Sequence, residues 1–385
     1  MGLTHSPKIV TDGLSFIYDT GSGKSYKGEP TTNLLNYTTE FNNWTAAKNS
    51  GTTPTVTADT SVNPLGLAGA PMADKVYLPD DGTYPRIQQY FTPASTNTHT
   101  FSVWIRSISG NCDCFLGAFR NSPWSLPGSS VKSITGEWQR FTFSWTPPDT
   151  TTHVIYMGSH DTAAQRGNTL EFWGAQMEAK SHATQFVNGT RSTTQGLLDL
   201  TKNETITLSN MSYDSNAQMT FDGTDDYFEI SDPNVSSLDG FSVELIIKPD
   251  NPTSSPAVIV PNSGGIDHWL RFDGNGRLYI RMIPAANSGG QNFKTSTQLS
   301  SGNYHHVVFT FKQSEGGKAY YNGALETSAA ATLTALDWSS IWRIGQRGNN
   351  TMFFEGELPV LKVYNRTLTA AEVLQNYNAL KSRFL

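Results

Sequence analysis

The sequence is poor in charged residues, and this shortage limits the partners that it can bind. Only 16% of its 385 residues are charged, against about 25% in a typical soluble protein. The 27 Lys and Arg form no basic run, and 33 Asp and Glu give a formal net charge of −6. Because phosphate binding needs clustered cations, we expect no nucleic-acid partner.

Cysteine is scarce as well. The two cysteines, Cys112 and Cys114, stand at C-x-C spacing. Neighbours that close rarely form an unstrained disulfide, and two ligands are too few for a metal site. We therefore expect free thiols and synthesis in a reducing cytoplasm.

Long apolar runs are also missing. No stretch reaches the roughly 20 apolar residues of a membrane span, and the opening MGLTHSPKIV lacks the apolar core of a secretory signal. We expect no membrane insertion.

Turn formers and aromatic residues, in contrast, are plentiful: 33 Gly, 19 Pro and 11% aromatic residues. Apolar and polar residues alternate in short runs at 101–106, 141–144, 241–245 and 306–311, each bounded by turn residues. This pattern is typical of antiparallel strands in sandwiches. The length suggests two or three domains, so we predict an all-β fold.

A single helix is predicted after residue 369. Thr369 and Glu372 stand at the spacing of a capping box. Val373, Tyr377 and Leu380 then fall on one helical face, which suits docking onto a sheet.

The second half carries a series of motifs in a fixed order. They are FDGTDDY at 221–227, FSVE at 241–244, YHHV at 304–307, AYYNG at 319–323, FEG at 354–356 and VYNRTL at 363–368. In order and spacing, residues 195–385 resemble the concanavalin A-like, laminin G-type jelly roll. One departure is Leu358-Pro359-Val360, where the family often has acidic residues, so an ion-related role at that place is in doubt.

The first half carries a different series. It consists of TNLL at 32–35, EFNNW at 40–44, FSVWIR at 101–106, GEWQRF at 136–141, WGAQME at 173–178 and ATQFV at 183–187. These motifs resemble the carbohydrate-binding-module type of jelly roll found in phage tail and head proteins.

The N-terminal residues resemble the opening strand of the second module. IVTDGL at 9–14 normally runs directly into a segment like Leu198-Asp199-Leu200-Thr201. We infer that residues 29–191 form a jelly roll inserted into a loop of a laminin G-like domain made of residues 1–28 and 192–385. Such an insertion costs little closure entropy when the loop ends lie close together; a simple N-terminal arm is the alternative. The predicted fold class is thus two antiparallel jelly-roll sandwiches, the second discontinuous, with a short C-terminal α-helix.

No catalytic set of residues stands out. Glycosidases place two carboxylates on either side of the scissile bond, but no E-x-D-x-x-E pattern occurs, and Glu355 and Glu357 have no third acid beside them. There is no G-x-S-x-G elbow. His305 and His306 are adjacent, so on a strand they point to opposite faces. We expect no enzymatic activity.

Three acids crowd the FDGTDDY motif. Asp222, Asp225 and Asp226 suit a turn in which carboxylates accept backbone N–H groups. The same oxygens suit calcium, which takes six to eight oxygen ligands. Both interpretations stay open, and calcium is the one cofactor considered.

Sugar-binding jelly rolls stack exposed aromatic rings on pyranose faces. Trp104 and Arg106 share the strand face opposite Phe101, Val103 and Ile105. We place Gln88 and Tyr90 on a neighbouring strand and Trp124 in a loop. The candidate ligand-binding residues are Trp104, Arg106, Gln88, Tyr90 and Trp124.

Each tryptophan also has a structural interpretation. Trp104 would cover the sheet, and Trp124 would dock onto a neighbouring subunit. The tryptophans expected in the core are Trp44, Trp138 and Trp173. The residues considered for the surface or an interface of the second module are Trp269, Arg271, Trp338, Trp342 and Arg347.

The phage resemblance implies a non-enzymatic structural and adhesion protein on the virion surface, as a head decoration or a tail fibre, made in the cytoplasm of a bacterial host. Its expected partners are capsid or tail proteins and host glycans, and the expected assembly is a homo-oligomer, a trimer. The alternatives are a carbohydrate-active hydrolase and an assembly protein without a ligand.

Overall fold

A computed structural model describes residues 8–66, 69–160, 162–233, 235, 239–261, 269–282, 291–330, 338, 341–348 and 350–385. The chain forms two compact units. Unit 1 consists of residues 1–29 and 192–385, and unit 2 consists of residues 30–191. The sequence placed the boundaries after residues 28 and 191.

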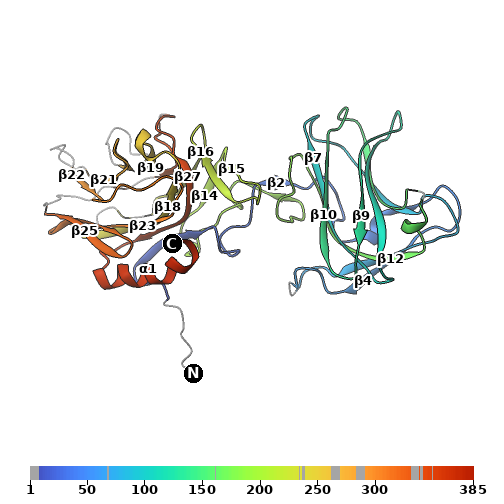
Figure 1. The fold of residues 1–385 in the computed structure, drawn as a ribbon, viewed down its shortest axis with the longest axis horizontal. Helices are drawn as coiled ribbons and strands as arrows, with labels where there is room; N and C mark the ends of the chain where they lie inside the picture. Colours follow the sequence, from blue (N-terminus) through green and yellow to red (C-terminus); the bar gives the residue numbers. More distant parts are fainter. Residues whose placement is uncertain are drawn as a thin grey trace, which may run out of the picture. The chain divides into compact units, whose positions relative to one another are not determined.

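Unit 2 contains two five-stranded antiparallel sheets (Figure 1). The β7 sheet has the order β10 (Gln139–Trp145), β7 (His99–Ser107), β12 (Asn168–Glu178), β5 (Ala73–Leu78) and β4 (Thr55–Ser61). The β11 sheet has the order β3 (Thr45–Ala47), β6 (Arg86–Phe91), β11 (His153–Gly158), β8 (Cys112–Arg120) and β9 (Ser125–Ile134). The remaining elements are β2 (Thr31–Thr32), which pairs with β13 (Thr190–Arg191), and the 3₁₀ turns η1 (Phe41–Asn43) and η2 (Ala163–Gln165).

The alternation of apolar residues gives unit 2 its core. Phe101, Val103 and Ile105 of β7 point inward and are fully buried, where they pack with inward residues of the β11 sheet such as Leu116. Cys114 lies in this core, and both cysteines are free thiols, as predicted.

Unit 1 contains a larger pair of antiparallel sheets (Figure 1). The β18 sheet has the order β15 (Ser212–Tyr213), β16 (Met219–Asp222), β27 (Glu355–Tyr364), β18 (Gly240–Pro249), β23 (His305–Lys312), β24 (Gly316–Tyr321) and β25 (Ala324–Ala329), with β1 (Leu14–Asp19) also on β27. The β19 sheet has the order β14 (Ile206–Ser209), β17 (Tyr227–Ile230), β26 (Trp342–Ile344), β19 (Ala257–Pro261), β20 (Trp269–Phe272), β21 (Leu278–Met282) and β22 (Gln291–Lys294). A 3₁₀ turn, η3 (Pro252–Ser254), follows β18.

The N-terminal strand is held by the segment that follows residue 191. Tyr26 forms an isolated bridge with Leu197. The Asp199 carboxylate accepts the backbone N–H of Ile17 at 3.0 Å, and Leu200 N–H donates to the Ile17 carbonyl at 2.8 Å. Residues 14–19 and 197–200, far apart in sequence, therefore lie side by side in unit 1.

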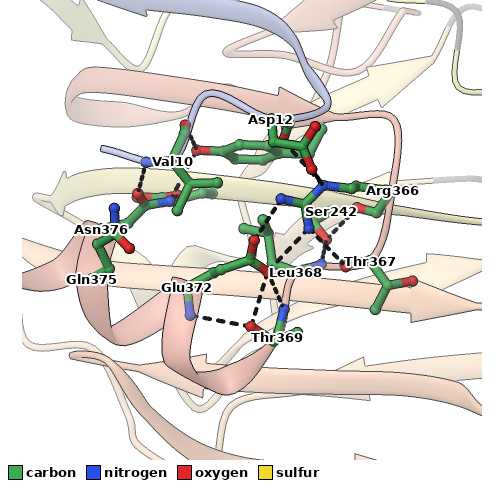
Figure 2. Close-up of polar contacts among 12 residues, drawn as sticks. Val10, Asp12, Ser242, Arg366, Thr367, Leu368, Thr369, Glu372, Gln375 and Asn376 are labelled. Atoms are coloured by element: carbon green, nitrogen blue, oxygen red, sulfur yellow. Dashed lines mark hydrogen bonds and ion pairs between the residues drawn. The ribbon is translucent and has the colours of Figure 1, made fainter. Parts of the chain in front are cut away.

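The predicted helix is α1 (Ala370–Phe384), and its capping box is confirmed. Val373 and Leu380 are buried by the helix face that packs on the β18 sheet. Figure 2 shows how the N-terminal segment joins this region: Val10 N–H donates to Asn376 Oδ1 at 2.7 Å, and Arg366 bridges Asp12 and Glu372.

A buried polar network lies on the β18 sheet close to this helix. Glu244 accepts from Lys362 Nζ at 2.8 Å and from Asn376 Nδ2 at 2.6 Å. His306 Nε2 lies 3.1 Å from the same carboxylate. These four side chains are essentially inaccessible to solvent, so the face is held by buried polar groups that contact one another, with His306 Nδ1 the one ring nitrogen left without a partner.

The fold class is confirmed: the described residues form antiparallel sandwiches and one C-terminal α-helix. In the described part of the chain, no helix combines the length and the apolar character that crossing a bilayer requires.

Candidate functional site: an aromatic face of unit 2

The five predicted ligand-binding residues do not form one site. Trp104 and Arg106 lie on β7, whereas Gln88 and Tyr90 lie on β6, which pairs with β3 and β11 in the other sheet. Placing Gln88 and Tyr90 beside β7 was therefore wrong. Alternation along a strand predicts which residues face outward, but it does not predict which of two sheets the strand joins.

The outer face of the β7 sheet is filled by the protein's own side chains. The Trp104 ring packs edge-on against Trp173 at 5.4 Å and lies under the Arg140 guanidinium at 4.4 Å. Arg106 pairs with Glu171 at 2.6 Å and lies over the Trp138 ring. Both predicted ligand-binding residues thus have internal partners.

The outer face of the β11 sheet carries a second, small apolar cluster outside the main core. It consists of Phe115 and Phe119 from β8 and Val154 and Tyr156 from β11. The Tyr156 ring lies 5.5 Å from Phe115 and 5.2 Å from Phe119. A cluster of buried rings on an outward face is unusual, because that face of a sheet is ordinarily polar.

A glycine lets these rings lie flat on the sheet. Gly117 stands between Phe115 and Phe119 on the outward side of β8, and a Cβ at this position would lie 2.5 Å from Phe115 Cε1. Any other residue at 117 would force the Phe115 ring away, since that distance is far below contact.

Trp124 and His160 lie on top of this cluster. Trp124, in the turn between β8 and β9, is parallel to Phe119 at 4.9 Å and remains 56% exposed. His160 is parallel to Phe115 at 4.5 Å. The exposed indole is thus held in one orientation by a buried ring beneath it, which lowers the entropy lost on binding a ligand.

Polar and aromatic groups of β6 flank the same face. Tyr90 is 50% exposed, and it stands across β11 from Phe119, since both residues pair with Val154. Two strand spacings, roughly 10 Å, separate Tyr90 from Phe119. Next to Tyr90, Gln88 accepts from Arg86 Nε at 2.7 Å, and the Arg86 guanidinium lies over the Tyr156 ring at 4.9 Å.

We define the aromatic face by Phe115, Phe119, Trp124, Tyr156 and His160, flanked by Tyr90 and Gln88. The sequence indicated Trp124, Tyr90 and Gln88 but missed the other four. The available signal was the outward row Phe115-Gly117-Phe119, in which aromatic residues occupy alternate positions that a solvated strand gives to polar residues.

Two clefts in the described residues contain acids. One, of about 510 Å³ in unit 2, is lined by a single carboxylate, Asp113. The other, of about 530 Å³ in unit 1, is lined by Asp199 and Glu204. Asp199 accepts backbone N–H groups from Ile17 and Glu204, and Glu204 accepts from the Ser231 hydroxyl, so both carboxylates have structural partners.

The FDGTDDY acids form a compact turn in unit 1. Oxygens of Asp222, Asp225 and Asp226 lie within 4.8 Å of one another. Asp222 accepts the N–H of Thr224 at 2.7 Å, and Asp226 Oδ2 accepts the N–H of Asp222 at 2.8 Å. Asp226 Oδ1 is buried without a hydrogen-bond partner, and burial raises the pKa of this carboxyl to about 6. The aspartates therefore accept the backbone N–H groups of the turn, as one of the two interpretations predicted, and the free, buried Oδ1 of Asp226 also suits a cation.

Three tryptophans lie elsewhere than predicted. Trp338 and Trp342 are fully buried in the core of unit 1 rather than at its surface. Trp138, expected in the core, is half-buried beneath Arg106. Trp44 and Trp173 are buried, as predicted.

Comparison with known proteins gives a match in unit 1. Residues 222–374 match the family model described as the concanavalin A-like lectin/glucanases superfamily. This part of the chain therefore has the concanavalin A-like, laminin G-type jelly-roll fold. No curated protein matches the chain.

Solved structures that match part of the chain include three binding domains. They are the botulinum neurotoxin serotype G binding domain (16% identity, TM-score 0.39, 48% of this chain and 48% of that structure), the receptor binding domain of botulinum neurotoxin D (14%, 0.38, 49% and 50%) and the binding domain of Paraclostridial Mosquitocidal Protein 1 (16%, 0.38, 48% and 49%). The chain thus spans about half the length of these structures.

Proposed function

We propose that this protein is a non-catalytic adhesion protein that binds glycans through the aromatic face of unit 2. One observation carries the proposal: Trp124 is 56% exposed and yet fixed by parallel packing on Phe119. An exposed, oriented ring that presents a free face to solvent is what stacking on a pyranose requires.

The surroundings of Trp124 suit a sugar rather than an apolar ligand. The partly exposed Arg86 supplies a guanidinium that hydrogen-bonds hydroxyls, and Tyr90 supplies a second exposed ring. Gln88, which is buried, accepts from Arg86 Nε and so helps to fix this guanidinium. Rings with a few planar polar groups between them give a carbohydrate both stacking and directional contacts. The roughly 10 Å between the Tyr90 and Phe119 positions, two strand spacings, leaves room for more than one sugar unit.

A binding role without catalysis is supported by what the acids do. Glycosidases need two carboxyl groups that face each other across the scissile bond, about 5–9.5 Å apart. In the described clefts, Asp113 stands without a second acid. Asp199 is committed to backbone N–H groups, and Glu204 in the same cleft accepts from the Ser231 hydroxyl. A polysaccharide-cleavage assay that detects turnover would contradict this part of the proposal.

The setting that we propose is the surface of a bacteriophage particle, on the head or in a tail fibre, with the protein made in the bacterial cytoplasm and assembled as a homo-oligomer, a trimer. The resemblance of both modules to phage proteins supports it. Electron microscopy of intact particles labelled with an antibody to unit 2 tests the setting, and a particle without label contradicts it.

We also propose calcium as a ligand of Asp222, Asp225 and Asp226. The buried free oxygen of Asp226 supports a cation there, because a buried carboxylate oxygen without a partner costs free energy. These carboxylates would hold the ion, and its charge would lock the turn that begins β17. Calcium should raise the midpoint of thermal unfolding of unit 1, and an unchanged midpoint would argue against the site.

The test of the binding face uses two pairs of matched variants. Trp124→Ala and Tyr90→Ala remove exposed rings of the aromatic face. Trp138→Ala and Tyr77→Ala remove partly exposed rings of the β7 sheet. Each protein is screened against purified bacterial surface polysaccharides and neutral polysaccharides.

We expect the first pair to weaken binding roughly tenfold each, equivalent to about 1.4 kcal/mol, without a change in thermal midpoint. The second pair should bind like the unchanged protein. Equal losses in both pairs would refute the aromatic face as the binding site. If no glycan binds while purified capsid or tail protein binds tightly, the assembly role without a glycan ligand replaces this proposal.

A further inference from the structure

Unit 1 has a second surface of different chemistry, on the outer face of the β19 sheet. Trp269 and Arg271 point outward from β20, because their neighbours in the strand fill the core. Tyr279 and Arg281 point outward from β21 for the same reason. Trp269 stands opposite Arg281, and Arg271 stands opposite Tyr279, so cations and rings alternate on one face.

The guanidinium groups are held against one indole ring. The Cζ atoms of Arg271, Arg281 and Arg347 lie 4.9, 5.2 and 5.6 Å from the centre of the Trp269 ring. Arg271 also lies 5.5 Å from the Tyr279 ring. Trp269 itself is only 9% exposed. The ring therefore serves as a scaffold that fixes the cations by cation–π attraction.

Arg271 and Arg281 differ from Arg343, Arg366 and Arg383 of unit 1 in their partners. Arg343, on the same sheet, pairs with Glu229 at 2.5 Å, and Arg383 pairs with Asp19 at 2.6 Å. Among the described residues, Arg271 and Arg281 make no ion pair with a carboxylate. The two guanidinium groups are at most about 10 Å apart, because each Cζ lies about 5 Å from the same ring centre. Like charges at this distance repel one another, and a bound anion would relieve the repulsion.

The positive charge continues onto the next strand. Lys294 of β22 stands opposite Tyr279 and is exposed. The cations thus extend over three neighbouring strands, roughly 10 Å across. Anionic groups that repeat along a polymer fit such a row better than one small anion does.

We propose that this arginine face (Trp269, Arg271, Tyr279, Arg281 and Lys294) binds an acidic polysaccharide through its carboxylate or sulfate groups. A guanidinium presents a planar fork that matches a carboxylate with two parallel hydrogen bonds. Nucleic acid fits less well, because single strands bind by stacking bases on exposed rings, and the Trp269 ring is covered by guanidinium groups. This inference concerns unit 1 and does not rest on the aromatic face of unit 2.

The test compares Arg271→Gln/Arg281→Gln with Arg383→Gln, which changes an arginine on α1 far along the chain. The probes are polygalacturonate as a carboxylated polymer, dextran as a neutral one, and a single-stranded oligodeoxynucleotide as another polyanion. Affinities are measured by titration at two salt concentrations, and thermal unfolding reports whether each variant folds.

We expect polygalacturonate to bind with an affinity that falls as the salt concentration rises, and any binding of dextran not to depend on Arg271 or Arg281. The double variant should bind polygalacturonate roughly tenfold more weakly for each arginine removed, whereas Arg383→Gln should bind it like the unchanged protein. Lys294→Gln changes an exposed side chain and should lower the affinity for polygalacturonate roughly threefold. This variant replaces the double variant in the test if the double variant fails to fold. An unchanged affinity for polygalacturonate in these variants, an equal loss of dextran binding in the double variant, or tighter binding of the oligonucleotide overturns the proposal.

Discussion

Replacing Lys362 with Met tests how the helix-covered face of the β18 sheet is stabilised. Lys362 supplies the positive charge that neutralises Glu244, 2.8 Å away, where both side chains are at most 1% exposed. Removing one partner of a buried ion pair leaves the other charge without compensation, which costs about 3–5 kcal/mol. Because a domain is stabilised by only about 5–15 kcal/mol, we expect unit 1 to unfold far more easily.

The same variant should reverse the pH dependence that Glu244 contributes. Burial raises the pKa of this carboxyl, but the Lys362 charge and the His306 hydrogen bond lower it more, to about 2. Relative to an ordinary value of 4.5, this corresponds to about 3 kcal/mol of stability. In the unchanged protein that contribution is present above pH 4.5 and is lost as the pH falls toward 2.

Without Lys362, burial dominates, and the pKa of Glu244 rises above its ordinary value. Its contribution is then present at low pH and is lost as the pH rises. The stability difference between the two proteins should therefore grow from pH 4 to pH 7.

Calorimetry measures this prediction, because we expect the two compact units to unfold in separate transitions. The transition of unit 2 is an internal control and should not move. Glu244→Gln/Lys362→Met, which removes both charges and keeps an acceptor for Asn376, should recover most of the loss. A Lys362→Met protein within about 1 kcal/mol of the unchanged protein at pH 7 would refute the reasoning.

Three further predictions follow from the same structure. Without calcium, Asp226→Asn should stabilise unit 1 by about 1–2 kcal/mol at pH 7 and should not stabilise it at pH 3.5. The reason is that the pKa of this carboxyl is raised to about 6, so its contribution to stability is lost as the pH rises through 6. Denaturation curves equal to those of the unchanged protein at both pH values would contradict this. Trp104→Ala should destabilise unit 2 by about 3–5 kcal/mol in chemical denaturation, since the ring packs against Trp173 and Arg140. An unchanged denaturation midpoint together with weaker glycan binding would instead support Trp104 as a ligand-binding residue. Replacing residues 30–190 with a short linker should leave unit 1 folded, because Tyr26 and Leu197 already pair at the junction; a product with the circular dichroism of an unfolded chain would count against the insertion.

Local patterns in the sequence predicted those parts of the fold that local chemistry determines. The alternation of Phe101, Val103 and Ile105 predicted an inward row, and the structure buries all three. The Thr369 and Glu372 spacing predicted the start of α1, because a capping box involves only residues three apart.

The sequence did not predict how strands combine into sheets. Tyr90 and Trp104 both face outward, but they lie on different sheets, since sheet membership depends on long-range pairing that no local pattern encodes. Burial of Trp338 and Trp342 was missed for the same reason: a tryptophan beside polar residues is assigned to the core only when its facing partners are known.

The most direct test of the account is hydroxyl-radical footprinting of the full chain with and without the polysaccharide that binds best. Trp124 and Tyr90 are exposed enough to be oxidised in the free protein, as are Trp138 and Tyr77 on the other sheet. We predict that the glycan protects Trp124 and Tyr90 and leaves Trp138 and Tyr77 reactive. Protection of Trp138 and Tyr77 with Trp124 still fully reactive would contradict it.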